Sequence, residues 1–172
     1  ERGYLESLHD PVAPLKIAVC DAFPGGMPSD PELVANARAV ATGLEAMGHS
    51  VEEATPDVDM LESHRIGYDL FLSRVQNFVT GLATSMGREL GPDMLEAMTL
   101  AALEEARAMT VERLYDGLAS LERLSLGMDL FMADYDLLVM PGVSKAPFQI
   151  GFADPQRAAP SGPSYLADEM PY

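Results

Sequence analysis

The stretch LKIAVC at residues 15–20 decides the fold that this sequence predicts. Its apolar, β-branched character and its length are typical of a buried β-strand. The turn residues PGGMP at 24–28 follow it and lead to Asp30 and Pro31, which fit the N-cap and the first position of a helix. We therefore expect a strand, a turn and a helix in succession from residue 15 onward.

The predicted helix carries apolar residues at steps of three and four, and Gly48 is placed to end it in the left-handed conformation. The expected inward stripe is Leu33, Ala37, Val40, Leu44 and Met47. Residues 50–54, SVEEA, alternate weakly and are closed by Pro56, which predicts a second strand. Strand, helix and strand at this spacing form a βαβ unit, most simply parallel and right-handed.

Residues 57–134 show no convincing strand, and their apolar residues recur at helical spacing. Breaks near residues 91–92 and at Thr110 predict one helix over 66–88, a second that starts at Pro92 and a third that is capped by Thr110. The residues expected to point inward from the last two helices are Leu95, Met98, Ala102, Leu114, Leu118, Leu121 and Met128. We expect the three helices to cover one side of a sheet.

The run DLLVM at 136–140 predicts a third strand, which Pro141 and Gly142 stop. Residues 147–163 are rich in Pro, Gly, Ala and Ser and predict a long loop. The expected fold class is α/β, with a mainly parallel or mixed sheet and a helical layer. We treat residues 1–172 as a single segment with a core over 15–151 and a C-terminal loop over 141–172.

Composition excludes several classes of partner. The formal net charge of −16 disfavours binding to nucleic acid or to anionic membranes. The sequence contains no apolar run of the roughly 20 residues that span a bilayer. Its single cysteine and three scattered histidines predict a reducing compartment, no metal and no cofactor. We expect an acidic cytoplasmic protein.

Residues with catalytic potential lack the patterns that nucleophilic catalysis needs. No serine lies in a G-x-S-x-G elbow, and the two lysines, Lys16 and Lys145, head a strand and lie in a loop. Glu52 and Glu53 are adjacent on a predicted strand, so they point to opposite faces and form no acid/base pair. The sequence predicts no catalytic residue.

Three stretches, taken together, resemble the amidase-signature family downstream of its glycine- and serine-rich signature. The first joins the strand at 15–19, DPE at 30–32 and GHSVEEATP at 48–56, which is similar to the family's Gly-His-x-Val-Glu-Glu-Ala-x-Pro turn. The second, GR at 87–88 with residues 96–99, looks like a segment of bacterial hydrolases of linear and cyclic oligoamides.

The third and most specific stretch is YDLLVMP at 135–141, followed by Pro147 and then by Ile-Gly at 150–151. It resembles the family's Tyr-Asp-Leu-Leu-Leu-Thr-Pro strand and the proline-glycine loop after it. Met140 stands where the family usually has threonine, so the hydroxyl of that threonine is absent.

Members of this family use a serine nucleophile, a second serine in a cis peptide and a lysine base, all upstream of the part that this chain resembles. The resemblance therefore implies a scaffold that carries none of the catalytic residues. It also implies that the loop after the last strand approaches the acyl pocket, with Pro141, Gly142 and Val143 as substrate-binding residues.

Two hypotheses follow. In the first, the chain is a segment of an amidase that cleaves a small-molecule amide through a serine acyl-enzyme, and the isolated segment is inactive. The chain begins at Glu1 and ends at Tyr172 without an initiator methionine, so we expect it to be cut from a longer protein. In the second, it is a complete, non-catalytic α/β binding or interaction module. A homodimer is left open in both.

Overall fold

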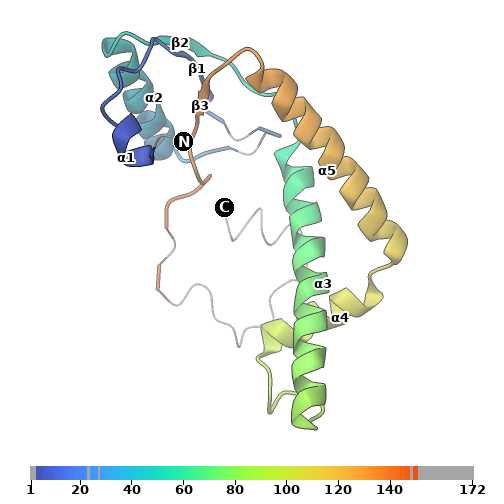
Figure 1. Ribbon diagram of the computed structural model, residues 1–172. Helices are drawn as coiled ribbons and strands as arrows, with labels where there is room; N and C mark the ends of the chain where they lie inside the picture. The colour runs from blue at the N-terminus through green and yellow to red at the C-terminus, as the bar shows by residue number, and fades with distance from the viewer. Residues whose placement is uncertain (1–2, 23, 27, 148, 151–172) are drawn as a thin grey trace.

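Three short parallel strands form the sheet of the α/β part of the molecule (Figure 1). The computed structural model describes residues 3–22, 24–26, 28–147 and 149–150. The strands are β1 (Lys16–Val19), β2 (Ser50–Glu53) and β3 (Leu137–Val139), in the order β2-β1-β3. Both pairings of β1 are parallel. The predicted α/β class and the parallel arrangement of the first two strands are confirmed.

The central strand, β1, is the most deeply buried of the three. Ile17 and Ala18 of β1 are fully buried, and Ile17 lies in register with Val51 on one side and Leu137 on the other. Residues in the outer strands are half-buried or exposed, because β2 and β3 each have one neighbour only. Apolar burial is therefore concentrated in the stretch that decided the predicted fold.

Helix α2 (Pro31–Ala46) covers the sheet and contacts all three strands. It begins at Pro31, and Gly48 adopts a φ of 96°, as predicted. The predicted inward stripe is wrong in part: Val40 and Met47 are exposed. The helix instead buries Ala37 and Ala41, whose small side chains let its backbone approach the strands closely.

Helix α1 (Tyr4–Ser7) is a single turn before β1 that the sequence pattern did not predict. Three longer helices, α3 to α5, lie between β2 and β3. Helix α3 (Met60–Met86) starts six residues before the predicted boundary, because Asp59 accepts a hydrogen bond from Glu62 N and caps it there. Its end at Gly87, with a φ of 62°, lies close to the predicted one.

Helix α4 (Ala97–Ala108) starts later than predicted, since residues 92–94 form a turn. Helix α5 (Val111–Met132) begins as predicted, with the hydroxyl of Thr110 accepting from Arg113 N at 3.1 Å. The start of α5 therefore follows local capping chemistry, whereas Glu96 at the start of α4 makes no side-chain capping bond.

Helices α4 and α5 both pack on α3, and the three form an arm that extends from the sheet; among the described helices, α2 is the one that covers the strands (Figure 1). The predicted cover of the sheet by all three is wrong. Leu72 of α3 and Leu103 of α4 are fully buried in the arm. Among the described residues, no helix has both the length and the apolar character to cross a membrane.

The inward face predicted for α5 is also wrong in part, because Leu118 and Leu121 are exposed. The close contacts of α5 are made at two glycines. A Cβ on Gly117 would lie 3.4 Å from Ile66 of α3, and one on Gly127 would lie 2.8 Å from Val58. Small residues therefore set the distance between these elements.

An ion pair fixes the register of α3 against α5. Arg113 Nε donates to Asp69 Oδ2 at 2.8 Å, and its Nη2 donates to Oδ1 at 2.5 Å. Asp69 is buried, and its hydrogen bond holds the pKa of Arg113 above the ordinary value. This bidentate geometry is directional, so it aligns two long helices that apolar packing alone would let slide.

Candidate functional site at the carboxyl edge of the sheet

The carboxyl ends of the three strands meet at one edge, because the strands are parallel. The chain leaves this edge through residues 20–22 after β1, 54–56 after β2 and 140–144 after β3. In α/β proteins this edge is the usual place for a ligand. It is therefore the candidate site.

The three residues predicted to bind substrate lie in the loop after β3. Pro141 is buried, Val143 is half-buried and Gly142 is exposed. No described atom lies within 4 Å of the position that a Cβ on Gly142 would take. The backbone at Gly142 thus borders open space, while the neighbouring Pro141 is buried.

Asp30 fixes this loop to the start of α2. Its backbone N–H donates to the carbonyl of Ser144 at 2.7 Å, and its carboxylate accepts from Ala146 N at 2.8 Å. The sequence predicted Asp30 as a helix N-cap, and it holds that position without a side-chain capping bond. Its carboxylate instead accepts a hydrogen bond from the loop after β3. This contact ties the loop to the start of α2.

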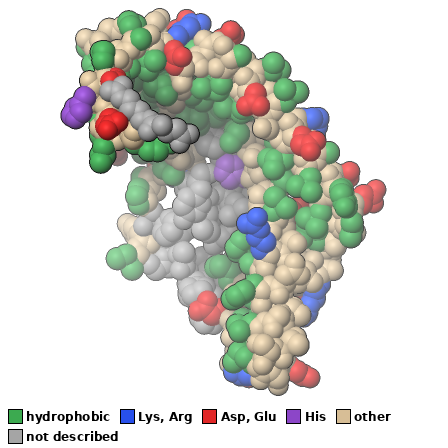
Figure 2. Space-filling model, in the orientation of Figure 1, with side chains coloured by type: hydrophobic (Ala, Val, Ile, Leu, Met, Phe, Trp, Pro, Cys, Tyr) green, Lys and Arg blue, Asp and Glu red, His purple; other side chains and the backbone are tan. Residues whose placement is uncertain are grey.

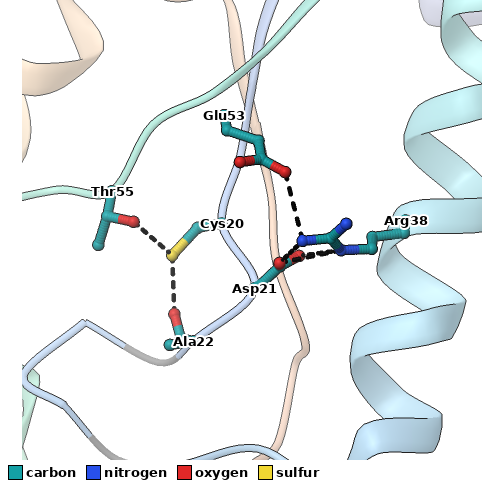
Figure 3. Close-up of polar contacts among 6 residues, drawn as sticks. All are labelled: Cys20, Asp21, Ala22, Arg38, Glu53 and Thr55. Carbon is teal, nitrogen blue, oxygen red and sulfur yellow. Dashed lines mark hydrogen bonds and ion pairs between the residues drawn. The ribbon is translucent and has the colours of Figure 1, made fainter.

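The loops after β1 and β2 are joined by the only cysteine of the chain. Cys20 is buried, its thiol donates to the carbonyl of Ala22 at 2.7 Å, and its sulfur lies 3.3 Å from the hydroxyl oxygen of Thr55 (Figure 3). A buried thiol that is engaged as a donor is a poor nucleophile, because thiolate formation needs access and a positive environment. Cys20 is therefore a structural link.

Arg38 of α2 neutralises two carboxylates at the same edge (Figure 3). Its Nε donates to both carboxylate oxygens of Asp21 at 2.9 Å, its Nη2 also contacts Asp21, and Nη2 lies 3.3 Å from Glu53. The hydrogen bond from Arg38 lowers the pKa of Asp21 below its ordinary value. Because Asp21 stays ionised and paired, it is unsuited to act as a general acid.

A separate cluster around Glu52 joins β2 to residues at the amino ends of β1 and β3. The hydroxyl of Tyr135 donates to Glu52 at 2.6 Å, and Lys16 Nζ lies 3.2 Å from the same carboxylate oxygen and 4.5 Å from the Tyr135 ring centroid. The hydrogen bond with Glu52 raises the pKa of Lys16. A lysine that acts as a base at neutral pH needs a lowered pKa, so the pairing of Lys16 with Glu52 does not favour that role.

The two adjacent glutamates do point away from each other, as predicted. Glu52 faces Lys16 and Tyr135, whereas Glu53 faces Arg38 on α2. Both side chains are largely solvated. Within the part of the chain that the structure describes, no group of three or more His, Cys, Asp or Glu side chains gathers to hold a metal ion.

Arg38 and Tyr135 organise these clusters, and the sequence predicted neither of their pairings, although Tyr135 begins the third matching stretch. Each pairs with a residue far along the chain, Arg38 with Asp21 and Tyr135 with Glu52. Arg38 is an exposed residue of α2, and its sequence neighbours carry no signal of such a pair. The register of β1 and β2 places Glu52 beside Ala18 and Glu53 beside Val19, and it cannot be deduced from the sequence alone.

No protein-family model matches this sequence, and no curated protein sequence matches it either. Two solved structures of 6-aminohexanoate cyclic dimer hydrolase, one of them complexed with substrate, are similar in structure. Their TM-scores are 0.80 and 0.81, each at 22% identity and over 96% of this chain. The chain spans 35% of the length of these hydrolase chains. The likeness shows that the chain has the fold of that part of a hydrolase.

Proposed function

We propose that this chain is the scaffold and pocket-wall segment of an amide-bond hydrolase of the amidase-signature type. The observation that carries the proposal is the structural likeness over 96% of the chain to 6-aminohexanoate cyclic dimer hydrolase. A cyclic dimer of an amino acid is closed by amide bonds, so hydrolysis of it is amide hydrolysis. The family that the sequence resembles acts on the same kind of bond.

Two of the three stretches that carry the sequence resemblance gather in the sheet. The motif at 48–56 contains β2 and the exit from it, and the motif at 135–141 contains β3 and Pro141. Both strands flank β1, which belongs to the first matching stretch together with the motif at 48–56. The first and third matching stretches thus meet in the sheet and at its carboxyl edge, whereas the second, residues 87–88 and 96–99, lies at the end of α3 and the start of α4.

In this proposal the chain supplies one wall of the substrate pocket. Gly142 and Val143 border the substrate, and the neighbouring Pro141 is buried. The Asp30 contacts to Ser144 and Ala146 hold the wall in place. Pre-set positions of this kind contribute to catalysis by orientation, because a bound group need not be ordered at the moment of reaction.

The nucleophile and its base come from elsewhere in the proposed longer protein. The acids at the carboxyl edge are engaged with Arg38, Cys20 is buried, and Lys16 has a raised pKa. The small-molecule amide substrate, the cytoplasmic location and the homodimer all stay predictions. The isolated chain is expected to be inert.

The experiment compares the isolated chain with the product of the complete reading frame that encodes it. Each is incubated with 6-aminohexanoate cyclic dimer and with a short aliphatic amide, and the released amine or ammonia is measured. We expect release by the complete product alone. Hydrolysis that co-purifies with the isolated chain would contradict the assignment of the chain as an inactive scaffold segment. A folded complete product that cleaves neither amide would instead favour the binding-module hypothesis.

A further inference from the structure

An uncovered apolar stripe runs along helix α3. Phe71, Phe78, Leu82 and Met86 follow one another at steps of seven, four and four, so they lie on one side of the helix. Their exposed fractions are 55%, 71%, 43% and 52%. We call these four residues the α3 stripe. It is about 22 Å long, at 1.5 Å per residue.

The stripe is separate from the packed side of α3. The buried residues along the same part of the helix, Leu72, Val79 and Ala83, point in another direction, and α3 contacts both α4 and α5. A helix that is apolar on two sides is typical of one buried on both. Figure 2 shows hydrophobic side chains along the lower part of this arm.

The charge around the stripe differs from that of the rest of the molecule. The chain contains 27 acidic residues in 172, yet residues 70–88 contain none. Arg74 and Arg88 are the charged residues of this interval, and both are exposed. A solvated face of so acidic a chain would carry carboxylates, so their absence indicates a surface that is covered in the intact protein.

The protein surface that covers the α3 stripe must be apolar, and its rim must tolerate the positive charge of Arg74. A second copy is disfavoured, because two chains that each carry a charge of −16 repel one another at long range. The structural neighbours are much longer, and this chain matches 35% of them at a TM-score of 0.80 or 0.81. A longer chain of that kind contains enough additional protein to cover the stripe.

We propose that the α3 stripe is the surface on which the remainder of the amide hydrolase docks. The inference rests on the proposed function. The partner is a part of the same longer protein, outside residues 1–172, that presents apolar side chains with an acidic or neutral rim. Docking there buries apolar area and places the acid-free side of α3 inside the protein.

Cysteine labelling tests this proposal, because the native Cys20 is 1% exposed and should not react in the folded protein. The test variant is Phe78→Cys. The control is Thr80→Cys, an exposed position that lies almost opposite on the helix, since two residues turn it by about 200°. Both are made in the isolated chain and in the complete reading-frame product, and the rate of maleimide labelling is measured.

In the isolated chain we expect both cysteines to react at similar rates. In the complete product we expect Cys at position 78 to react at least about tenfold more slowly than in the isolated chain, with Thr80→Cys unchanged. If Phe78→Cys does not fold by circular dichroism, Leu82→Cys replaces it, and its expected protection is the same.

Three outcomes overturn the proposal: equal labelling of position 78 in both proteins, a reading frame that encodes no additional chain, or protection in the isolated chain that disappears on dilution to monomer. The last outcome assigns the stripe to a second copy. Labelling is read without any substrate, so protection in a product that cleaves no amide would contradict the proposed function and leave the docking surface standing.

Discussion

The carboxylate of Asp30 accepts a hydrogen bond from the backbone N–H of Ala146 at 2.8 Å, across 116 residues of sequence. This contact joins the start of α2 to the loop that follows the last strand. It is the structural reason why the candidate pocket wall has a fixed position, because the backbone of Asp30 also binds Ser144.

Removing this contact should loosen the loop. We expect Asp30→Ala to lower the free energy of unfolding by only about 1 kcal/mol, because the bond is exposed to solvent. Amide hydrogen exchange at Ala146 should become faster, because its N–H loses its acceptor. The control, Asp30→Asn, retains an acceptor oxygen and should change both quantities less. Unaltered exchange at Ala146 in Asp30→Ala would show that the loop is held by other contacts.

The pair of Asp21 and Arg38 predicts a dependence of stability on acid. The hydrogen bond from Arg38 lowers the pKa of Asp21 below its ordinary value of 3.8. A depressed carboxyl pKa stabilises the folded state above the unfolded-state pKa, and this contribution is lost as the pH falls through the folded-state pKa. The stabilisation should therefore be complete at neutral pH and vanish in acid.

Arg38→Gln tests this expectation. The variant should be less stable than the parent sequence at pH 5 to 7, and the difference should close as the pH falls below about 4. Urea unfolding across this range measures it. Arg107→Gln, at an exposed position of α4, serves as the matched control and should show no such closure. A difference that persists unchanged to low pH would exclude the ion pair as its cause.

Packing in the helical arm predicts a contrast between two leucines. Leu72 is fully buried, whereas Leu126 of α5 is exposed. We expect Leu72→Ala to cost about 2–5 kcal/mol of unfolding free energy, because it leaves a cavity. Leu126→Ala should cost less than about 0.5 kcal/mol. Equal losses at the two sites would mean that α3 and α5 pack differently from the arrangement seen here.

The proposed pocket wall predicts an effect on substrate binding in the complete protein. Gly142→Trp adds a large side chain beside open space, so the fold should tolerate it while the pocket narrows. We expect KM for a bulky amide to rise at least about tenfold, and KM for the smallest amide to change less. The thermal midpoint should stay within a few degrees. Unchanged KM for both would remove Gly142 from the pocket.

Local signals in the sequence predicted much of the fold. The apolar run at 15–20 gave the buried central strand, and Pro31, Gly48 and Thr110 marked helix ends that the structure confirms. These features depend on backbone chemistry within a few residues. They can be recognised without knowledge of the rest of the molecule.

The inward faces of the helices could not be predicted in the same way. Helices α2 and α5 are apolar on more than one side, so periodicity alone did not distinguish the packed side from the exposed one. The packed sides are marked by Ala37, Gly117 and Gly127, whose small size permits close approach. The pairs of Arg38 and Tyr135 depend on tertiary register, which a single sequence does not reveal.

The most direct test of the central claim locates the covalent intermediate. The complete reading-frame product is mixed with an activated ester or amide, quenched in acid and digested, and the acylated peptide is identified by mass spectrometry. We predict an acyl group on a serine outside residues 1–172. An acyl group on a serine within residues 1–172 would contradict the account, because this segment would then contain the nucleophile rather than a wall of the pocket.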